Sequence, residues 1–244
     1  MKFAVFASSA ALVASTVNAH GYMSVPKADF PNGIDTSYLK TIDADNHAVF
    51  KGNKWNDSPD NNVAMFTKVF KSQSTYKTLK DLIDSEKVDA CGKNVLNAQA
   101  IDVSKENSVK WGNDQEQKGF ITSHSGPCEV WIDNTKVAQA DNCVKAYPTY
   151  PASIPVDYSA CKGECTLTFY WLALHEPKWQ IYKNCAKIKN GSGGGATAPT
   201  TAPTTPSKAP TTPTNPQPTN APQPTSTPAP TKKNCSRRRA LRQE

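Results

Sequence analysis

The hydrophobic pattern of the chain indicates strands in its second half. Residues 120–134, FITSHSGPCEVWIDN, and residues 165–175, CTLTFYWLALH, are rich in β-branched and aromatic residues and are bounded by Gly, Pro and Cys. Such segments are typical of β-strands. Further along, Gln180 and Tyr182 stand two positions apart, so a strand there would direct both side chains to one face and Ile181 to the other.

The first half of the chain has less regular patterning. Residues 74–87, STYKTLKDLIDSEK, carry apolar positions at helical spacing, which predicts one short amphipathic helix with Ser74 or Thr75 as its cap. Residues 24–60 are polar and aperiodic, so we expect long loops there. Few helices and several short strands predict a mainly β fold, an immunoglobulin- or fibronectin-III-like antiparallel β-sandwich with long loops, one or two short helices and disulfide staples.

Composition divides the 244-residue chain into three parts. Residues 1–19 contain one Lys, an apolar run and a small-residue end, which is the pattern of a secretion signal cleaved after Ala19. Residues 20–190 have the size of one ordinary domain. Residues 191–244 are rich in Thr and Pro and end in a basic segment, so we expect a disordered tail that carries O-glycans.

The cysteines fit a secreted protein, because disulfides form outside the cell. Six of the seven lie within the predicted domain and can pair internally, whereas Cys235 stands alone in the tail. No second apolar segment of membrane-spanning length follows the signal, so we expect no membrane span and a soluble monomer. The expected pairs are Cys91–Cys185, Cys128–Cys143 and Cys161–Cys165.

Charge argues against one class of partner. Residues 20–190 contain 20 Lys, 20 acidic residues and no Arg, so the domain has no formal net charge, and the overall +7 comes mainly from the tail. No basic stripe with interleaved aromatics is present, which argues against nucleic-acid binding. Lysines would still suit an acidic polymer if they gather on one face, because their ammonium groups meet carboxylates without a fixed geometry.

His20 would be the first residue of the processed chain. A terminal histidine offers two metal ligands, its α-amine and its ring Nδ1, and the amine titrates at about pH 8, so a metal displaces its proton easily. A ring nitrogen from a second histidine would complete a set of three nitrogens, which favours Cu(II). The alternative is that His20, one of 4 histidines in the chain, follows the cleavage site by accident.

The later segments supply candidate partners for His20. His124 precedes Ser-Gly-Pro in TSHSGPCEVWIDN, and Gln180 and Tyr182 stand near the end of LALHEPKWQIYKNC. A phenol and an amide would then flank a copper ion held by two histidines. His175, five residues before Gln180, is either a neighbour of the metal site or a hydrogen-bonded histidine at a strand end.

Three motifs resemble the lytic polysaccharide monooxygenases (LPMOs), copper enzymes with a histidine brace. These are HGYMSVP, SHSGPCEVWIDN and WLALHEPKWQIYKNC, which follow one another in the family's order. Within that superfamily the chain looks most like the oomycete pectin-active auxiliary activity family 17. The resemblance implies that His20 supplies its amine and Nδ1, that His124 supplies Nε2, that Tyr182 is axial and that Gln180 positions oxygen.

The resemblance also implies an activity. A secreted copper enzyme would cleave plant cell-wall polysaccharide oxidatively, with pectic homogalacturonan as the expected substrate and cellulose or chitin as less expected ones. It would use O2 or peroxide and an external electron donor. Two alternatives stay open: a copper-binding protein without catalysis, and a carbohydrate-binding or adhesion module on a stalk. Tyr22, Trp55, Tyr147 and Tyr150 are candidates for sugar stacking, although the sequence favours a structural role for any single one of them.

Overall fold

The structure is a computed structural model that describes residues 20–191. Two β-sheets form its framework, which confirms the expected mainly β sandwich. The predicted secretion signal and the Thr/Pro-rich tail beyond residue 191 lie outside the described residues and stay predictions. The smaller sheet has the order β1-β4-β7 and consists of β1 (Tyr22–Val25), β4 (Ser108–Gly112) and β7 (Ala152–Pro155).

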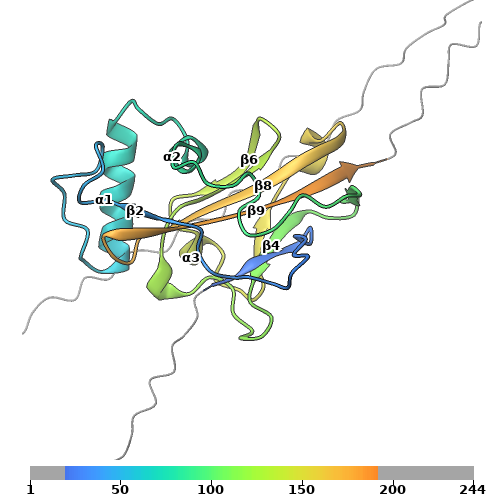
Figure 1. Ribbon diagram of the computed structural model, residues 1–244, viewed down its shortest axis with the longest axis horizontal. Coiled ribbons are helices and arrows are strands. Elements are labelled where there is room, and N and C mark those ends of the chain that lie inside the picture. Colours follow the sequence, from blue (N-terminus) through green and yellow to red (C-terminus); the bar gives the residue numbers. More distant parts are fainter. Residues whose placement is uncertain (1–19, 192–244) are drawn as a thin grey trace, which may run out of the picture. The chain divides into compact units, whose positions relative to one another are not determined.

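The larger sheet has six strands. All of its pairs are antiparallel except one, between its second strand in chain order and its last, which is parallel. The two longest strands pair with each other at its centre (Figure 1). Its path runs β2 (Thr41–Asp43), β9 (Lys178–Asn190), β8 (Gly163–Ala173), β5 (Cys128–Ile132) and β6 (Thr135–Ala140), and β3 (Ile101–Asp102) lies beside β9.

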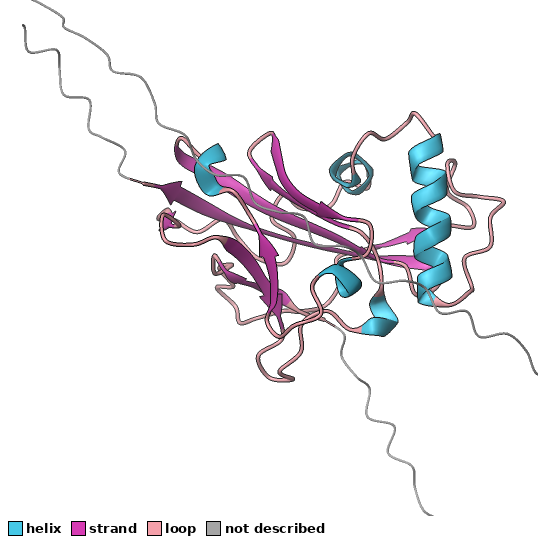
Figure 2. Ribbon diagram, turned by 180° about the vertical axis from the view of Figure 1, so that it is seen from behind, coloured by secondary structure: helices cyan, strands magenta, loops and turns pink. Residues whose placement is uncertain are grey.

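Short helical segments complete the domain. They are α1 (Pro59–Ser72), α2 (Leu79–Ser85), α3 (Cys143–Ala146) and the 3-10 turns η1 (Thr122–His124) and η2 (Tyr158–Ala160). Figures 1 and 2 both show α1 standing across the end of the β8–β9 pair at which these two strands are joined. Among residues 20–191 no helix combines the length and the apolar character needed to cross a membrane.

Side-chain alternation along β8 divides the core into two clusters. Phe169 and Trp171 face the smaller sheet and pack with Trp111 of β4. Tyr170 and Leu172 point the other way and pack with residues of α1 and α2. Because both faces of β8 are covered, its sequence is a nearly continuous apolar run instead of an alternating one.

The outer cluster is built around aromatic rings from the segment between β1 and β3. Trp179 of β9 packs edge-on against Phe50 and Trp55, with ring centroids 4.7 and 4.8 Å apart, and against Phe66 of α1 at 5.3 Å. Each buried large apolar side chain contributes about 1.5–3 kcal/mol relative to an exposed one. This segment therefore packs on the sheet as a layer, although its first part has little regular structure.

Helix α1 is the main difference from the sequence prediction. Residues 24–60 are mostly turns, as expected, but they also contain the end of β1, all of β2 and the start of α1. Ser58 caps this helix, because its hydroxyl accepts a hydrogen bond from the Asn61 amide at 3.3 Å, and Pro59 takes the first helical position. Both features are N-terminal helix signals that the polar first turn obscures.

Helix α2 lies inside the predicted helical segment but begins later than expected. Its cap is Thr78, whose hydroxyl accepts from the Asp81 amide at 3.0 Å, while the Asp81 carboxylate accepts from the Thr78 amide at 3.0 Å. The expected caps, Ser74 and Thr75, precede the helix. The reciprocal capping box decides the boundary, because it satisfies two backbone donors at once.

The predicted strand over residues 120–134 is also shorter than expected. Only Cys128–Ile132 pairs in the sheet, and the part that contains His124 is a 3-10 turn. Pro127 has no N–H to donate to a strand ladder. Gly126 lies against the carbonyl of Leu172 with no room for a Cβ atom. The turn therefore brings His124 to the end of the sheet instead of into it.

Three disulfides join the cysteine pairs expected from the sequence. Cys128–Cys143 and Cys161–Cys165 close local loops, with sequence separations of 15 and 4. Cys91–Cys185 spans a separation of 94 and joins the segment after α2 to β9. The long-range bond therefore fastens the outer layer to the central strand pair.

We predict that Thr78→Ala lowers the free energy of unfolding by about 1 kcal/mol, because it removes the side-chain acceptor of the capping box. Thr75→Ala is the matched control, since Thr75 is exposed and lies outside α2; we expect it to change stability by less than about 0.5 kcal/mol. Urea unfolding followed by circular dichroism measures both variants. Equal effects would show that Thr78 is not the cap.

Candidate metal centre

The structure brings all five predicted site residues together near the turn between β8 and β9. His20 lies two residues before β1, and His124 ends η1. His175 lies in the turn, and Gln180 and Tyr182 lie on β9. The centroids of the His20 ring and the His124 ring are 6.2 Å apart, those of His20 and Tyr182 are 5.8 Å apart, and those of His124 and His175 are 4.0 Å apart.

Strand β1 carries His20 to this position because it contacts both sheets. Tyr22 pairs with Gly112 of β4 in the smaller sheet. The next residue, Met23, donates its amide to the side-chain oxygen of Asn184 on β9 at 2.9 Å. Asn184 is buried and lies two positions beyond Tyr182 on the same face of β9. The start of β1 is thereby held in front of Tyr182.

Gln180 and Tyr182 face the same side of β9 and contact each other. The Tyr182 hydroxyl donates to Gln180 Oε1 at 2.6 Å. The Tyr182 ring stacks on Trp171 with centroids 4.5 Å apart, and the residue is only 2% exposed. Burial, together with the charge of Tyr38, raises the pKa of Tyr182 above its ordinary range. The phenol is therefore protonated at neutral pH and orients the Gln180 amide.

His124 is held as a neutral imidazole. Burial lowers its pKa to about 3, with smaller contributions from the charges of His175 and His20. The Ser123 hydroxyl lies 3.1 Å from its Nδ1. This contact engages Nδ1, and the ligand atom implied by the LPMO resemblance is the other nitrogen, Nε2. A neutral ring keeps a lone pair for a metal, so no proton has to be displaced first.

His175 stacks on His124 and lines the same site. The two rings are inclined by only 26°. Its Nδ1 is buried without a hydrogen-bond partner, and its Nε2 lies 3.6 Å from Glu176 Oε1. Burial lowers its pKa, although Glu176 acts in the opposite direction. Parallel rings cannot both point a nitrogen at one ion between them, so His175 supports the His124 ring and does not complete a pair of ligands with it.

The ring positions of His20 and His124 suit a metal ion between them. Two imidazoles that ligate one ion from opposite sides have centroids about 6 Å apart, since metal–nitrogen bonds are about 2 Å long. Among residues 20–191 no three His, Cys, Asp or Glu side chains converge on a metal position. If the chain is cleaved after Ala19, as the sequence predicts, the α-amine of His20 would be a third nitrogen donor beside the two rings.

Two acidic groups act on the His20 ring. Glu116 and Asp35 oppose the lowering of the His20 pKa by burial. Each carboxylate has a lysine partner: Lys118 lies 3.9 Å from Glu116, and Lys93 lies 3.3 Å from Asp35. The carboxylates that act on His20 are thus each accompanied by a lysine.

The aromatic residues that the sequence offers for sugar contact differ in burial and in their contacts. Trp55 and Tyr22 are buried, at 1% and 6% exposure, and Trp55 belongs to the outer core cluster. Tyr150 donates its hydroxyl to Asp114 at 2.6 Å. Tyr38, which the sequence pattern does not single out, is 39% exposed, and its ring lies 6.2 Å from that of His20. Tyr38 lies in an aperiodic loop, so the sequence gives no sign that its ring lies beside that of His20.

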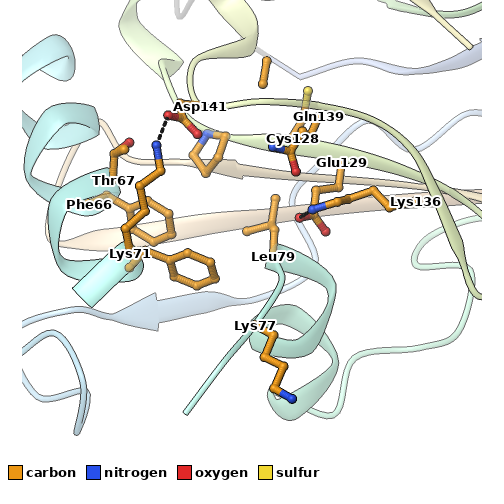
Figure 3. A pocket seen from close by; sticks show the side chains of 13 residues that line it. Phe66, Thr67, Lys71, Lys77, Leu79, Cys128, Glu129, Lys136, Gln139 and Asp141 are labelled. Atoms are coloured by element: carbon orange, nitrogen blue, oxygen red, sulfur yellow. Dashed lines mark hydrogen bonds and ion pairs between the residues drawn. The ribbon is translucent and has the colours of Figure 1, made fainter. Parts of the chain in front are cut away.

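A separate hollow of about 260 Å³ lies between α1, α2 and the β5–β6 pair (Figure 3). Phe66, Phe70 and Leu79 form its apolar part, and the ion pair between Lys71 and Asp141, 2.8 Å long, closes one side. None of the predicted site residues lines it. The hollow therefore belongs to the packing of the outer layer on the sheet and not to the histidine site.

Comparison with known proteins adds little. No protein-family model and no curated protein matches the chain. A solved structure described as an LPMO from Kitasatospora papulosa is similar at 18% identity, with a TM-score of 0.29; the match covers 40% of this chain and 55% of that one. The chain thus matches little more than half of that protein's length, and a likeness of this size assigns no family.

The low pKa of His124 predicts acid sensitivity in the metal-free protein. The unfolded chain binds a proton on this histidine at about pH 6.5, whereas the folded protein binds it only near pH 3. Between these values the unfolded state holds more protons, so the free energy of unfolding falls as the pH is lowered below about 6.5. We expect His124→Gln to reduce this fall in urea titrations at several pH values.

NMR provides the direct check on the same group. The His124 ring resonances should show no titration between about pH 7.5 and about pH 4.5 in the folded protein. His47 is the internal comparison, because its ring is less deeply buried and packs on Phe50 away from the site, at 4.9 Å between centroids. A normal titration curve for His124 would contradict a buried neutral imidazole.

Proposed function

We propose that the processed chain is a copper-dependent monooxygenase that oxidises polysaccharide at the His20–His124 site. The observation that carries the proposal is the meeting of His20, His124, Gln180 and Tyr182, which come from three distant parts of the sequence, within one hydrogen-bonded and ring-packed cluster. The same residues are those that the LPMO resemblance assigns to the histidine brace. Copper binding, catalysis and substrate are parts of this proposal.

His20 and His124 would hold the copper ion. Cleavage after Ala19 turns the peptide nitrogen of His20 into an amine, which, with the two rings, gives a nitrogen-rich donor set of the kind that Cu(II) prefers. The neutral state of His124 supports this role, since a protonated ring would repel the ion. When bound, copper supplies the one-electron chemistry that O2 or peroxide needs to oxidise a sugar C–H bond next to a glycosidic bond.

The other residues would prepare the surroundings of the metal. Gln180 Oε1 accepts a hydrogen bond from Tyr182, so the amide NH2 group would be left to donate to O2 or peroxide. Tyr182 would stay protonated, and its ring packs against Trp171. This packing would keep the phenol in position to donate to the Gln180 amide. His175 covers one face of the His124 ring and limits access of water to it.

Pectic homogalacturonan is the substrate that we propose first, on the strength of the sequence motifs. The charges around His20 do not add to that support, because Glu116 and Asp35 are acidic and each has a lysine partner. Tyr38, exposed beside His20, offers a ring to any sugar, charged or neutral. Products from pectin, cellulose and chitin must therefore be compared directly.

We predict that copper binding requires processing at Ala19. One extra residue before His20 converts its amine into an amide, which is a poor ligand at neutral pH and breaks the chelate. Calorimetry should show Cu(II) affinity at least about 100-fold weaker for the extended protein than for the processed one, equivalent to about 2.8 kcal/mol. Equal affinities would contradict the proposed histidine brace. A carbohydrate-binding module, which needs no free amine, would then be the better assignment.

A pair of substitutions separates metal binding from turnover. His124→Ala should lose most of the Cu(II) affinity, whereas Gln180→Ala should keep the affinity but release at least about 10-fold less oxidised oligosaccharide from pectin, in line with the loss of a positioned hydrogen-bond donor. His47→Ala is the control histidine variant, with both properties unchanged. Mass spectrometry identifies the products; oxidised fragments from cellulose or chitin alone would overturn the pectin assignment.

A further inference from the structure

We infer that Asn113 is a positioning residue that fixes His20 after the signal is removed. The inference rests on the proposed function, because it concerns how the chain presents its amine and imidazole to copper. Its basis is a hydrogen bond from Asn113 Nδ2 to the His20 carbonyl oxygen, 3.0 Å long. Asn113 follows β4 directly and is only 8% exposed.

A terminal residue needs such an anchor. After cleavage His20 is attached to the protein only through Gly21, and chain ends fray unless something ties them down. Strand pairing begins one residue later, where Tyr22 lies opposite Gly112. The His20 carbonyl is the only backbone group of that residue that processing leaves unchanged, and this is the group that Asn113 holds.

The Asn113 amide is a rigid donor. Its Oδ1 accepts the backbone amides of Gln115 and Glu116 at 3.0 and 3.3 Å, so the NH2 group must point to the other side, toward His20. The Asn113 backbone is itself paired in both directions with Lys118, at 2.7 and 3.3 Å. The loop after β4 thus fixes the direction in which this side chain donates.

Gly21 closes the opposite side of the same peptide group. A Cβ atom at this position would lie 2.8 Å from Trp111 Nε1 and 3.0 Å from the Gly112 carbonyl oxygen, which is too close for any real side chain. Trp111 is buried at 1% exposure in the core and cannot move aside easily. The peptide group between His20 and Gly21 is therefore held by Asn113 at its oxygen and by Trp111 at the next Cα.

Fixing this peptide group organises the chelate in advance. The α-amine and the imidazole of His20 both branch from its Cα, so they reach one metal ion together only for a narrow range of torsion angles. A held carbonyl leaves few torsions to be ordered when the metal binds, and pre-ordering of this kind improves affinity. The hydrogen bond from Asn113 therefore explains how a chelate formed by one terminal residue, His20, can have a fixed geometry.

The test compares Asn113→Asp with the wild-type processed protein. Aspartate keeps the Oδ1 acceptor for Gln115 and Glu116 but replaces the NH2 donor with an oxygen that repels the His20 carbonyl. The expected Cu(II) affinity is about 3- to 10-fold weaker, the loss of one hydrogen bond, and the copper electron paramagnetic resonance spectrum should change its hyperfine splitting. In the metal-free protein the NMR order parameter of the Gly21 amide should fall to a value typical of a flexible terminus.

Asn97→Asp is the matched control. The Asn97 amide also donates to a backbone carbonyl, that of Lys187, at 3.1 Å and accepts from the amide of the same residue at 2.8 Å. Lys187 lies seven residues beyond Gln180 on β9, away from the histidines. The control should therefore leave the Gly21 order parameter, the copper affinity and the spectrum unchanged.

The outcomes separate this inference from the proposed function. If wild-type protein binds no copper, the proposed function fails, but the Gly21 order parameter still decides whether Asn113 anchors His20. If Asn113→Asp does not fold, Gly21→Ala is the second variant, because its added Cβ atom would clash with Trp111 and displace the peptide group that follows His20. It should lower the order parameter at residue 21 in the same way. Unchanged order parameters, affinity and spectrum in a folded Asn113→Asp protein would overturn the inference.

Discussion

Burial of both faces of β9 is the constraint on which the rest of the structure depends. From residue 179 to residue 186 every position is buried, so each polar side chain needs an internal partner, because an unpaired buried polar group is costly. Lys183 points outward and pairs with Asp84 of α2 at 2.8 Å. Gln180 and Asn184 point inward, where they bind Tyr182 and the Met23 amide. The polar residues of one strand thereby determine where α2 and β1 dock.

The candidate site follows from the same alternation. The start of β1 docks on inward positions of β9, and this contact places His20, which precedes β1, in front of Tyr182. His124 arrives by a different route, in a turn that Gly126 and Pro127 prevent from joining the sheet. Stability and site geometry are therefore coupled, since a change in how β1 docks on β9 would move His20 relative to His124.

The sequence predicts those features that depend on neighbours along the chain. The β-rich segments, the shared face of Gln180 and Tyr182, and the two local disulfides all follow from short-range patterns. Features set by distant contacts are not readable in this way. Nothing near Asn113 indicates that its amide meets a backbone 93 residues away, and nothing near Tyr38 indicates that its ring lies beside that of His20. Helix α1 is an intermediate case, since its cap signals are present but its Asn-rich first turn hides the periodic pattern.

The outer layer has a consequence for any shortened or recombined form of the domain. Tyr170, Leu172 and Ile181 on the outer side of the larger sheet are almost fully enclosed by the segment that contains α1 and α2. If this segment were deleted, an apolar sheet surface would meet water and favour self-association. The larger sheet therefore depends on this segment to cover its outer side. In any shortened or recombined descendant, another element would have to shield the same sheet before the domain could exist as a monomer.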